Sequence, residues 1–113
     1  MNLSKEKIEE LKKAHPEGVY EGEMTFTDAE DKFHKVEFIF RVPLVADIES
    51  HNKSAQKNPI VANINLIQSL IVHPEPASVI DAIKEYPIAY GRFVEEVVAP
   101  FFGGNTTSRK TKI

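Results

Sequence analysis

Cysteine is absent from this sequence of 113 residues. Without it the chain can form no disulfide bond, no thiolate zinc site and no cysteine nucleophile. Long apolar runs are absent as well: no stretch of about 18 residues is apolar enough to span a bilayer, and the first residues lack the apolar run of a secretory signal. We therefore expect a cytoplasmic protein that depends on a packed apolar core.

An excess of positive charge is also missing. The chain has 14 Lys and Arg against 17 Asp and Glu, which gives a net charge of -3. Such a balance creates no basic field of the kind that attracts nucleic acid or anionic membranes. The basic residues near the end, Arg109, Lys110 and Lys112, stand without aromatic stacking partners and would bind phosphates only weakly. The sequence predicts protein partners, with no nucleic acid and no membrane.

Patterns that carry catalysis or metal binding are not found. The histidines are His15, His34, His51 and His73. None has a partner at the spacing of a metal pair, so we interpret them as surface or loop residues. Glu21 and Glu23 share a strand face, where a solvated pair is a simpler interpretation than an acid and base pair. Gly103-Gly104 follows a helix and therefore makes no phosphate loop. The sequence predicts a non-catalytic protein with no metal and no cofactor.

Apolar residues are concentrated in residues 59–102, where prolines divide the stretch into three helices. Proline is tolerated in the first turn of a helix and disfavours helix at the residue before it. A further helix is expected over residues 43–57. We expect residues 60–71 to be the most buried helix, with one wide apolar stripe. The stripe comprises Ile60, Val61, Ile64, Ile67, Leu70 and Ile71.

The first part of the chain has two other patterns. Residues 4–14 form a short amphipathic helix that Ser4 can cap, and residues 19–42 alternate apolar and polar residues as a β-hairpin does. The alternating apolar positions are Tyr20, Met24, Phe26, Val36, Phe38, Phe40 and Val42. Two strands are marginal alone. The hairpin must pack on the helices, pair with its own copy in a homo-oligomer, or join another protein's sheet.

These patterns predict an α+β fold. It comprises an N-terminal helix, a β-hairpin at about 19–42 and a C-terminal bundle of about four helices at 43–102. We assign residues 1–104 to a single domain. Residues 105–113 are polar and without pattern, which favours a disordered tail.

Four proline junctions separate these elements in a characteristic order. They are Arg41-Val42-Pro43, Lys57-Asn58-Pro59, His73-Pro74-Glu75-Pro76 and Tyr86-Pro87. A hairpin followed by helices with these junctions resembles the small tail assembly chaperones encoded by tailed bacteriophages and prophages. The resemblance covers about residues 20–102, and the helix over residues 4–14 has no counterpart in it.

The resemblance implies a non-catalytic protein of the bacterial host cytoplasm. Members of that family coat the tape measure protein, keep its long hydrophobic helix in solution and are thought to help recruit tail tube protein. Many are also made in a longer, frameshifted form. The short polar end from Asn105 onward is similar to the short form. Two other classes stay open at this point: a structural virion component of the tail or head completion, and a small regulator or enzyme unrelated to phage.

A chaperone for a long helix needs an apolar groove or an unpaired strand edge. Phe33 and Ile39 are apolar positions on the hairpin face opposite the core set, and we predict that they bind the partner. Tyr90 and Phe101 are further candidates. The alternative is that the N-terminal helix covers Phe33 and Ile39. Leu66 and Ile88 are apolar residues outside the main helical stripes.

Overall fold

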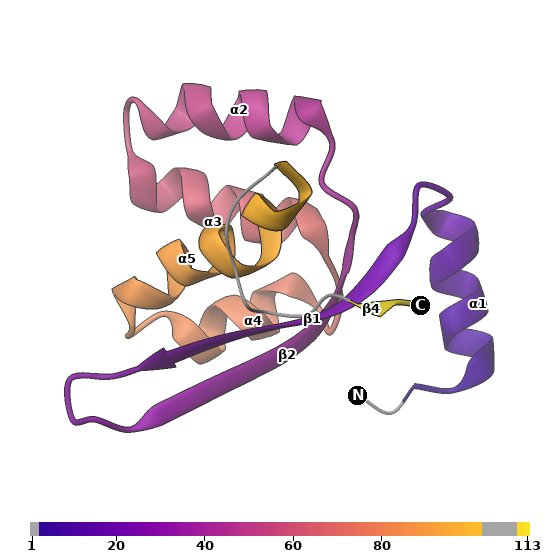
Figure 1. Cartoon of the computed structure of the whole chain (residues 1–113), viewed down its shortest axis with the longest axis horizontal. Helices are drawn as coiled ribbons and strands as arrows, with labels where there is room; N and C mark the ends of the chain where they lie inside the picture. Colours follow the sequence, from indigo (N-terminus) through magenta and orange to yellow (C-terminus); the bar gives the residue numbers. More distant parts are fainter. Residues whose placement is uncertain (1–2, 103–110) are drawn as a thin grey trace.

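Figure 1 shows a computed structural model of the chain, which describes residues 3–102 and 111–113. The order of elements confirms the predicted α+β class. They are α1 (Lys5–Ala14), β1 (Val19–Thr27), β2 (Phe33–Arg41), α2 (Val45–Ala55), α3 (Pro59–Leu70), β3 (Ile71–His73), α4 (Pro76–Ile83), α5 (Pro87–Phe93), the π-helical η1 (Val94–Val98), the 3₁₀-helical η2 (Ala99–Phe102) and β4 (Thr111–Lys112).

The helices begin where their first residues predict. Ser4 accepts a hydrogen bond from the N–H of Lys7 (3.1 Å), and Asn58 accepts one from the N–H of Val61 (3.2 Å). These side chains satisfy amide donors that have no partner within the helix. Proline occupies the first turn of α3, α4 and α5. The predicted starts of these three helices are therefore confirmed, whereas the helix expected over residues 43–57 is shorter, because α2 runs from Val45 to Ala55.

The last of the three helices expected within residues 59–102 is not one regular α-helix. After α5, the N–H of Ala99 donates to the carbonyl of Val94, one residue further back than in an α-helix. The next residue, Pro100, has no N–H to donate. The chain therefore passes from α-helix through a π-helical to a 3₁₀-helical segment.

The hairpin is confirmed, and two short strands flank it. β1 and β2 are antiparallel from Val19 opposite Arg41 to Thr27 opposite Phe33, and the sheet order is β3-β2-β1-β4. Our expectation that only helices follow the hairpin is wrong, because β3 pairs with β2 and β4 pairs with β1. Strands of two or three residues are too short to show the period of two that reveals a strand in a sequence.

The predicted disordered tail is wrong at its end. Within residues 105–113, residues 105–110 lie outside the part of the chain that the structure describes, but β4 lies beside β1. The N–H of Ile113 donates to the carbonyl of Val19 (3.0 Å). Backbone pairing of this kind needs no apolar pattern, which explains why the polar sequence did not predict it.

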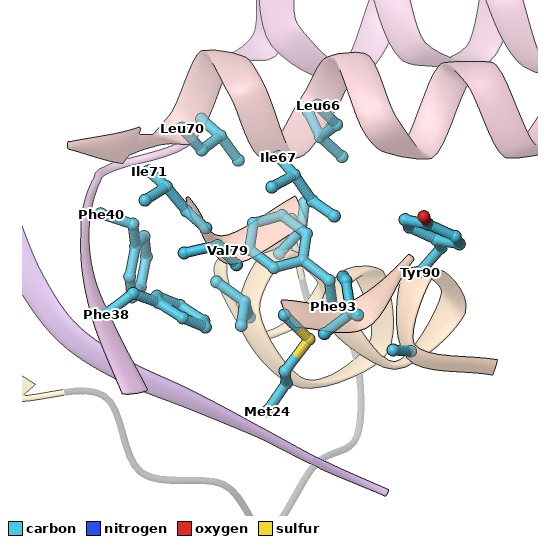
Figure 2. Packing of buried hydrophobic residues seen from close by; sticks show 14 of the residues in the cluster. Met24, Phe38, Phe40, Leu66, Ile67, Leu70, Ile71, Val79, Tyr90 and Phe93 are labelled. Carbon is cyan, nitrogen blue, oxygen red and sulfur yellow. The ribbon is translucent and has the colours of Figure 1, made fainter. Parts of the chain in front are cut away.

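The main core lies between one face of the hairpin and the helices α3, α4 and α5 (Figure 2). Met24, Phe38 and Phe40 project from the sheet toward Phe93 and Ile67, and all of these side chains are fully buried. Burying a phenylalanine side chain contributes roughly 1.5–3 kcal/mol. Of the inward set predicted from the alternation, all but Val42 belong to this core, and Val42 lies after the end of β2.

A smaller cluster occupies the opposite face at one end of the sheet. Leu11 of α1 packs there with Val19 and Ile39, and Leu3, Val72 and Ile113 lie against them. Figure 1 places α1 beside β4 at this end, while the hairpin turn lies at the far end of the molecule. The N-terminal helix is therefore docked through few apolar contacts.

The buried side of α3 is rotated from the predicted stripe. Ile60 and Val61 are exposed, whereas Ala62 and Leu66 are buried with Ile67 and Leu70. The reason is tertiary, because α2 packs along one flank of α3 while the sheet and α5 cover another. An apolar stripe this wide does not determine which of its edges is covered.

Substitution of Gly22 in β1 tests how tightly the hairpin is packed against the core. A Cβ at Gly22 would lie 2.6 Å from Cε1 of Phe40, a ring that is fully buried. We expect Gly22→Ala to lower the free energy of unfolding by about 1–3 kcal/mol, because the ring cannot move without disturbing the core. Urea denaturation measures this difference.

Gly91 of α5 provides the matched control. A Cβ there meets nothing within 4 Å. Gly91→Ala should raise the free energy of unfolding by about 0.5–1 kcal/mol, as alanine is the better helix former. Equal effects of the two substitutions would contradict the close contact at Gly22.

Candidate functional site

The surface carries several large apolar side chains that are about half exposed or more. They are Phe33 (68%), Leu44 (48%), Val45 (64%), Ile60 (54%), Val61 (46%) and Ile88 (57%). Apart from Phe33 at the start of β2, they stand just before or within the first turns of α2, α3 and α5. Exposed apolar side chains mark an interaction site where they gather into one patch, so these positions are the starting points for locating such a site.

The four residues that we predicted to bind a partner differ in their exposure to solvent. Phe33 is exposed, whereas Ile39 is buried against Leu11 of the N-terminal helix. Tyr90 is buried in the main core, and the half-buried ring of Phe101 packs on the sheet. The alternative that α1 covers the outer hairpin face thus holds for Ile39. Only Phe33 offers a largely open surface.

An open groove of about 690 Å³ lies between the hairpin tip and the corner that joins α4 to α5. One wall includes Asp28, Ala29, Glu30 and Lys32, and the other consists of residues 85–88. Ile88 therefore lies at this groove. Of the apolar residues that the sequence placed outside the main stripes, Ile88 is exposed, whereas Leu66 is buried.

The hairpin tip is organised by the carboxylate of Asp28. Its Oδ1 accepts hydrogen bonds from the N–H groups of Glu30 (2.8 Å) and Lys32 (3.0 Å), and its Oδ2 lies 2.7 Å from Nε2 of His34. The hydrogen bond with His34, aided by those backbone N–H groups, lowers the pKa of Asp28 below its usual value. Asp31 adopts a positive φ of 62° within this turn.

His34 connects the tip to the helical corner. Its ring stacks on Phe26 (centroids 4.8 Å apart, 11° between planes) and lies 4.6 Å from the ring of Tyr86. The histidine that we expected on the surface or in a loop is therefore in a strand and half-buried. The cluster of Phe26, Asp28, His34 and Tyr86 holds the two walls of the groove together.

The edge of β1 next to α5 is occupied by side chains. Oε2 of Glu96 accepts a hydrogen bond from the N–H of Thr25 (3.2 Å), and Nε of Arg92 donates to the carbonyl of Thr25 (3.1 Å). Arg92 also forms a salt bridge with Glu96, whose residue exposure is 4%. These two side chains replace the hydrogen bonds that a further strand would make.

The outer edge of β2 is paired over only part of its length. β3 pairs with β2 at Ile39 and Phe40, and within the described residues β2 has no partner strand on that side nearer the hairpin turn. The exposed face there is charged, since Lys35 lies 3.3 Å from Glu23 and 3.2 Å from Glu37. A charged face of this kind limits non-specific pairing.

The helix α2 is attached by polar contacts and by the half-buried side chain of Ile48, which packs against the main core. Arg41 of β2 forms two hydrogen bonds of 2.8 Å with Asp47, and His51 lies 2.6 Å from the side-chain oxygen of Asn63. The guanidinium of Arg41 lowers the pKa of Asp47, and Asp47 raises the pKa of Arg41. No residue of α2 is fully buried. This helix is the most peripheral part of the helical layer in Figure 1.

The described part of the chain contains neither a candidate membrane-spanning helix nor a candidate group of metal ligands. None of its helices combines the length and apolar character needed to cross a bilayer. Across residues 3–102 and 111–113, no three His, Cys, Asp or Glu side chains are grouped as ligands for a metal ion.

Comparisons with known proteins give a family and a fold. A family model described as "Domain of unknown function (DUF6848)" matches residues 7–110. A solved structure, that of the uncharacterised protein rbstp2171 from Bacillus stearothermophilus, is similar with a TM-score of 0.61 and 24% identity. The similarity covers 90% of this chain and 97% of that one. A search of curated proteins finds no match. At this identity the solved structure supports the fold alone.

Removing the guanidinium of Arg92, which binds the edge of β1 and Glu96, should destabilise the fold. Arg92→Leu leaves the buried Glu96 carboxylate without its charged partner, and we expect the free energy of unfolding to fall by about 2–3 kcal/mol. Glu95→Gln removes the other, exposed partner of Arg92 and should change it by less than about 0.5 kcal/mol. Denaturant unfolding of both variants checks this. A difference smaller than about 0.5 kcal/mol between them would show that the edge contact is unimportant.

The Asp28 carboxylate should make stability depend on pH in acid. Its pKa is lower in the folded than in the unfolded chain, so the ionised form stabilises the fold above the unfolded value of about 3.9. This stabilisation is lost as the pH falls through the folded pKa. We expect Asp28→Asn, which keeps an oxygen for the turn, to show a smaller decrease in Tm on acidification below about pH 4.

Asp81 of α4 supplies the control for this measurement, because its side chain is 75% exposed. Thermal melts of Asp81→Asn should follow the parent protein. An Asp28→Asn protein whose Tm decreases as steeply as the parent's would contradict the role of Asp28.

Proposed function

We propose that this chain, which belongs to the family described as "Domain of unknown function (DUF6848)", is a non-catalytic assembly chaperone for the tail of a tailed bacteriophage or prophage. Its partner is the tape measure protein, and it supports assembly of the tail tube, in which tail tube protein is a further possible partner. It acts in the cytoplasm of the bacterial host.

The observation that carries this proposal is the distribution of exposed apolar side chains. Phe33, Val45 and Ile88 are each more than half exposed and belong to three different elements. A protein that keeps a long hydrophobic helix in solution needs apolar contacts of this kind, set among charged residues that keep the complex dispersed. The net charge of -3 and the charged outer face of the hairpin meet the second requirement.

The order of elements gives further support. A hairpin, then α2, then α3 leading to His73-Pro74-Glu75-Pro76 and two short helices is the arrangement on which the resemblance to tail assembly chaperones rests. The two short outer strands and α1 are additions to that pattern. They complete the sheet and cover Ile39, and they leave the hairpin tip open.

A structural virion component is the second candidate, and the edge of β2 favours it. Between the hairpin turn and Ile39 this edge lacks a partner strand among the described residues. A neighbouring subunit or a second copy could add a strand there, as in assemblies held by shared sheets. Such a component would remain in the finished particle, whereas a chaperone leaves before completion.

Co-expression with a helical fragment of the tape measure protein tests the chaperone function. We expect the fragment to be insoluble alone and to elute with this protein in gel filtration when the two are made together. A triple variant with lysine at Phe33, Val45 and Ile88 should lose the complex, because it charges three exposed apolar positions.

A second triple variant with lysine at Glu49, Asn52 and Gln68, which are exposed polar positions, should keep the complex. Failure of the parent protein to hold the fragment in solution would refute the chaperone function. Detection of the protein in purified virions would instead favour the structural component.

A further inference from the structure

The groove between the hairpin tip and the α4–α5 corner has an apolar centre. Tyr86, Pro87 and Ile88 line it from the corner, and Ala29 lines it from the hairpin turn. The side chain of Ile88 is largely open to solvent, with 57% of the residue exposed. An apolar stripe on a partner could therefore bury Ile88 without displacing any residue of this chain.

Acidic residues flank the apolar centre on both walls. Glu30 lies on the hairpin wall and Glu85 on the helical wall, and both are exposed. Within residues 3–102 and 111–113 neither carboxylate belongs to a salt bridge, whereas Glu23 and Glu37 are both paired with Lys35. The other charged groups that face the groove are Lys32, His34 and Asp28, and Asp28 is already engaged by His34. Counting the described residues alone, the groove has two carboxylates outside any salt bridge and one lysine.

The two walls are held at a defined separation. His34 of the hairpin packs on Tyr86 of the corner, and Asp28 holds His34 at 2.7 Å. Phe26 lies on the other side of the histidine ring and also contacts Tyr86 (5.3 Å). A groove whose walls are already ordered loses little conformational entropy when it binds a partner.

We propose that this groove binds an amphipathic helix of the partner whose apolar stripe is flanked on both sides by lysine or arginine. The stripe lies on Ile88 and Pro87, and the flanking cations reach Glu30 on one side and Glu85 on the other. Long basic side chains can lie along apolar surface while their charged ends reach a carboxylate. The inference rests on the proposed chaperone function, since it specifies the segment of the tape measure helix that is recognised.

A pair of synthetic helices provides the direct test. Both have about 16 residues and the same leucine stripe, flanked by lysine in one peptide and by glutamate in the other. Fluorescence anisotropy should show the lysine peptide binding at least about tenfold more tightly, and added salt should reduce that difference. Amide chemical shift changes should be centred on residues 28–32 and 85–88.

Two matched variants locate the contact. Ile88→Lys should weaken binding of the lysine peptide at least about tenfold, because it places a charge at the apolar centre. Ile60→Lys alters a residue of similar exposure, 54%, on α3 and should change binding less than about twofold. Both positions are exposed, and an unchanged Tm checks that the fold is kept. Equal binding of the two peptides, or equal effects of the two variants, would overturn the proposal.

The same variants separate this proposal from the chaperone function. If the Ile88→Lys and Ile60→Lys proteins both hold the tape measure fragment as well as the parent does, the assignment of partner binding to the groove is wrong and the chaperone function stands. If the parent fails to hold the fragment but binds the lysine peptide at the groove, a basic helix remains the ligand and the tape measure assignment is wrong.

Discussion

The contact between the aromatic face of the hairpin and the helices is the interaction on which the rest of the structure depends. Two strands alone are barely stable, and here Phe38 and Phe40 are buried only because α3, α4 and α5 cover them. The same contact leaves Gly22 without room for a side chain, since the ring of Phe40 lies over it. This contact covers one face of the hairpin. The outer face, the two strand edges and the turn lie outside it.

Short strands, one pair of side chains and the N-terminal helix cover parts of the edges and of the outer face of the sheet. β4 and the Arg92–Glu96 pair occupy the outer edge of β1, and β3 occupies part of the edge of β2. α1 covers the outer face only near Ile39. These additions lie toward one end of the sheet or beside α5. The hairpin tip is left as the exposed part of the sheet, held by Asp28, His34 and Tyr86, and it forms one wall of the groove to which we assign partner binding.

Much of the fold could be predicted because its signals are local. Proline marks the starts of α3, α4 and α5, Ser4 caps α1, and the period of two reveals β1 and β2. The short strands and the orientation of α3 could not be predicted, because pairing partners and the covered side of a wide stripe depend on distant residues. The groove was not predicted from the sequence, because none of the four residues that we expected to bind a partner lines it. Phe33 is exposed elsewhere, Ile39 and Tyr90 are core residues, and the role of His34 at the groove has no sequence motif.

The sequence by itself determined the α+β class, the hairpin and the starts of α1, α3, α4 and α5, since capping, proline geometry and hydrophobic period act over a few residues. Only the tertiary structure decided which apolar residues remain exposed and where acidic and apolar groups meet. The groove combines Glu30 and Ala29 with Glu85 and Ile88, and β2, α2, α3, β3 and α4 lie between these two pairs along the chain. Their proximity follows from packing of the hairpin on the helical layer, and packing is a property of the whole chain.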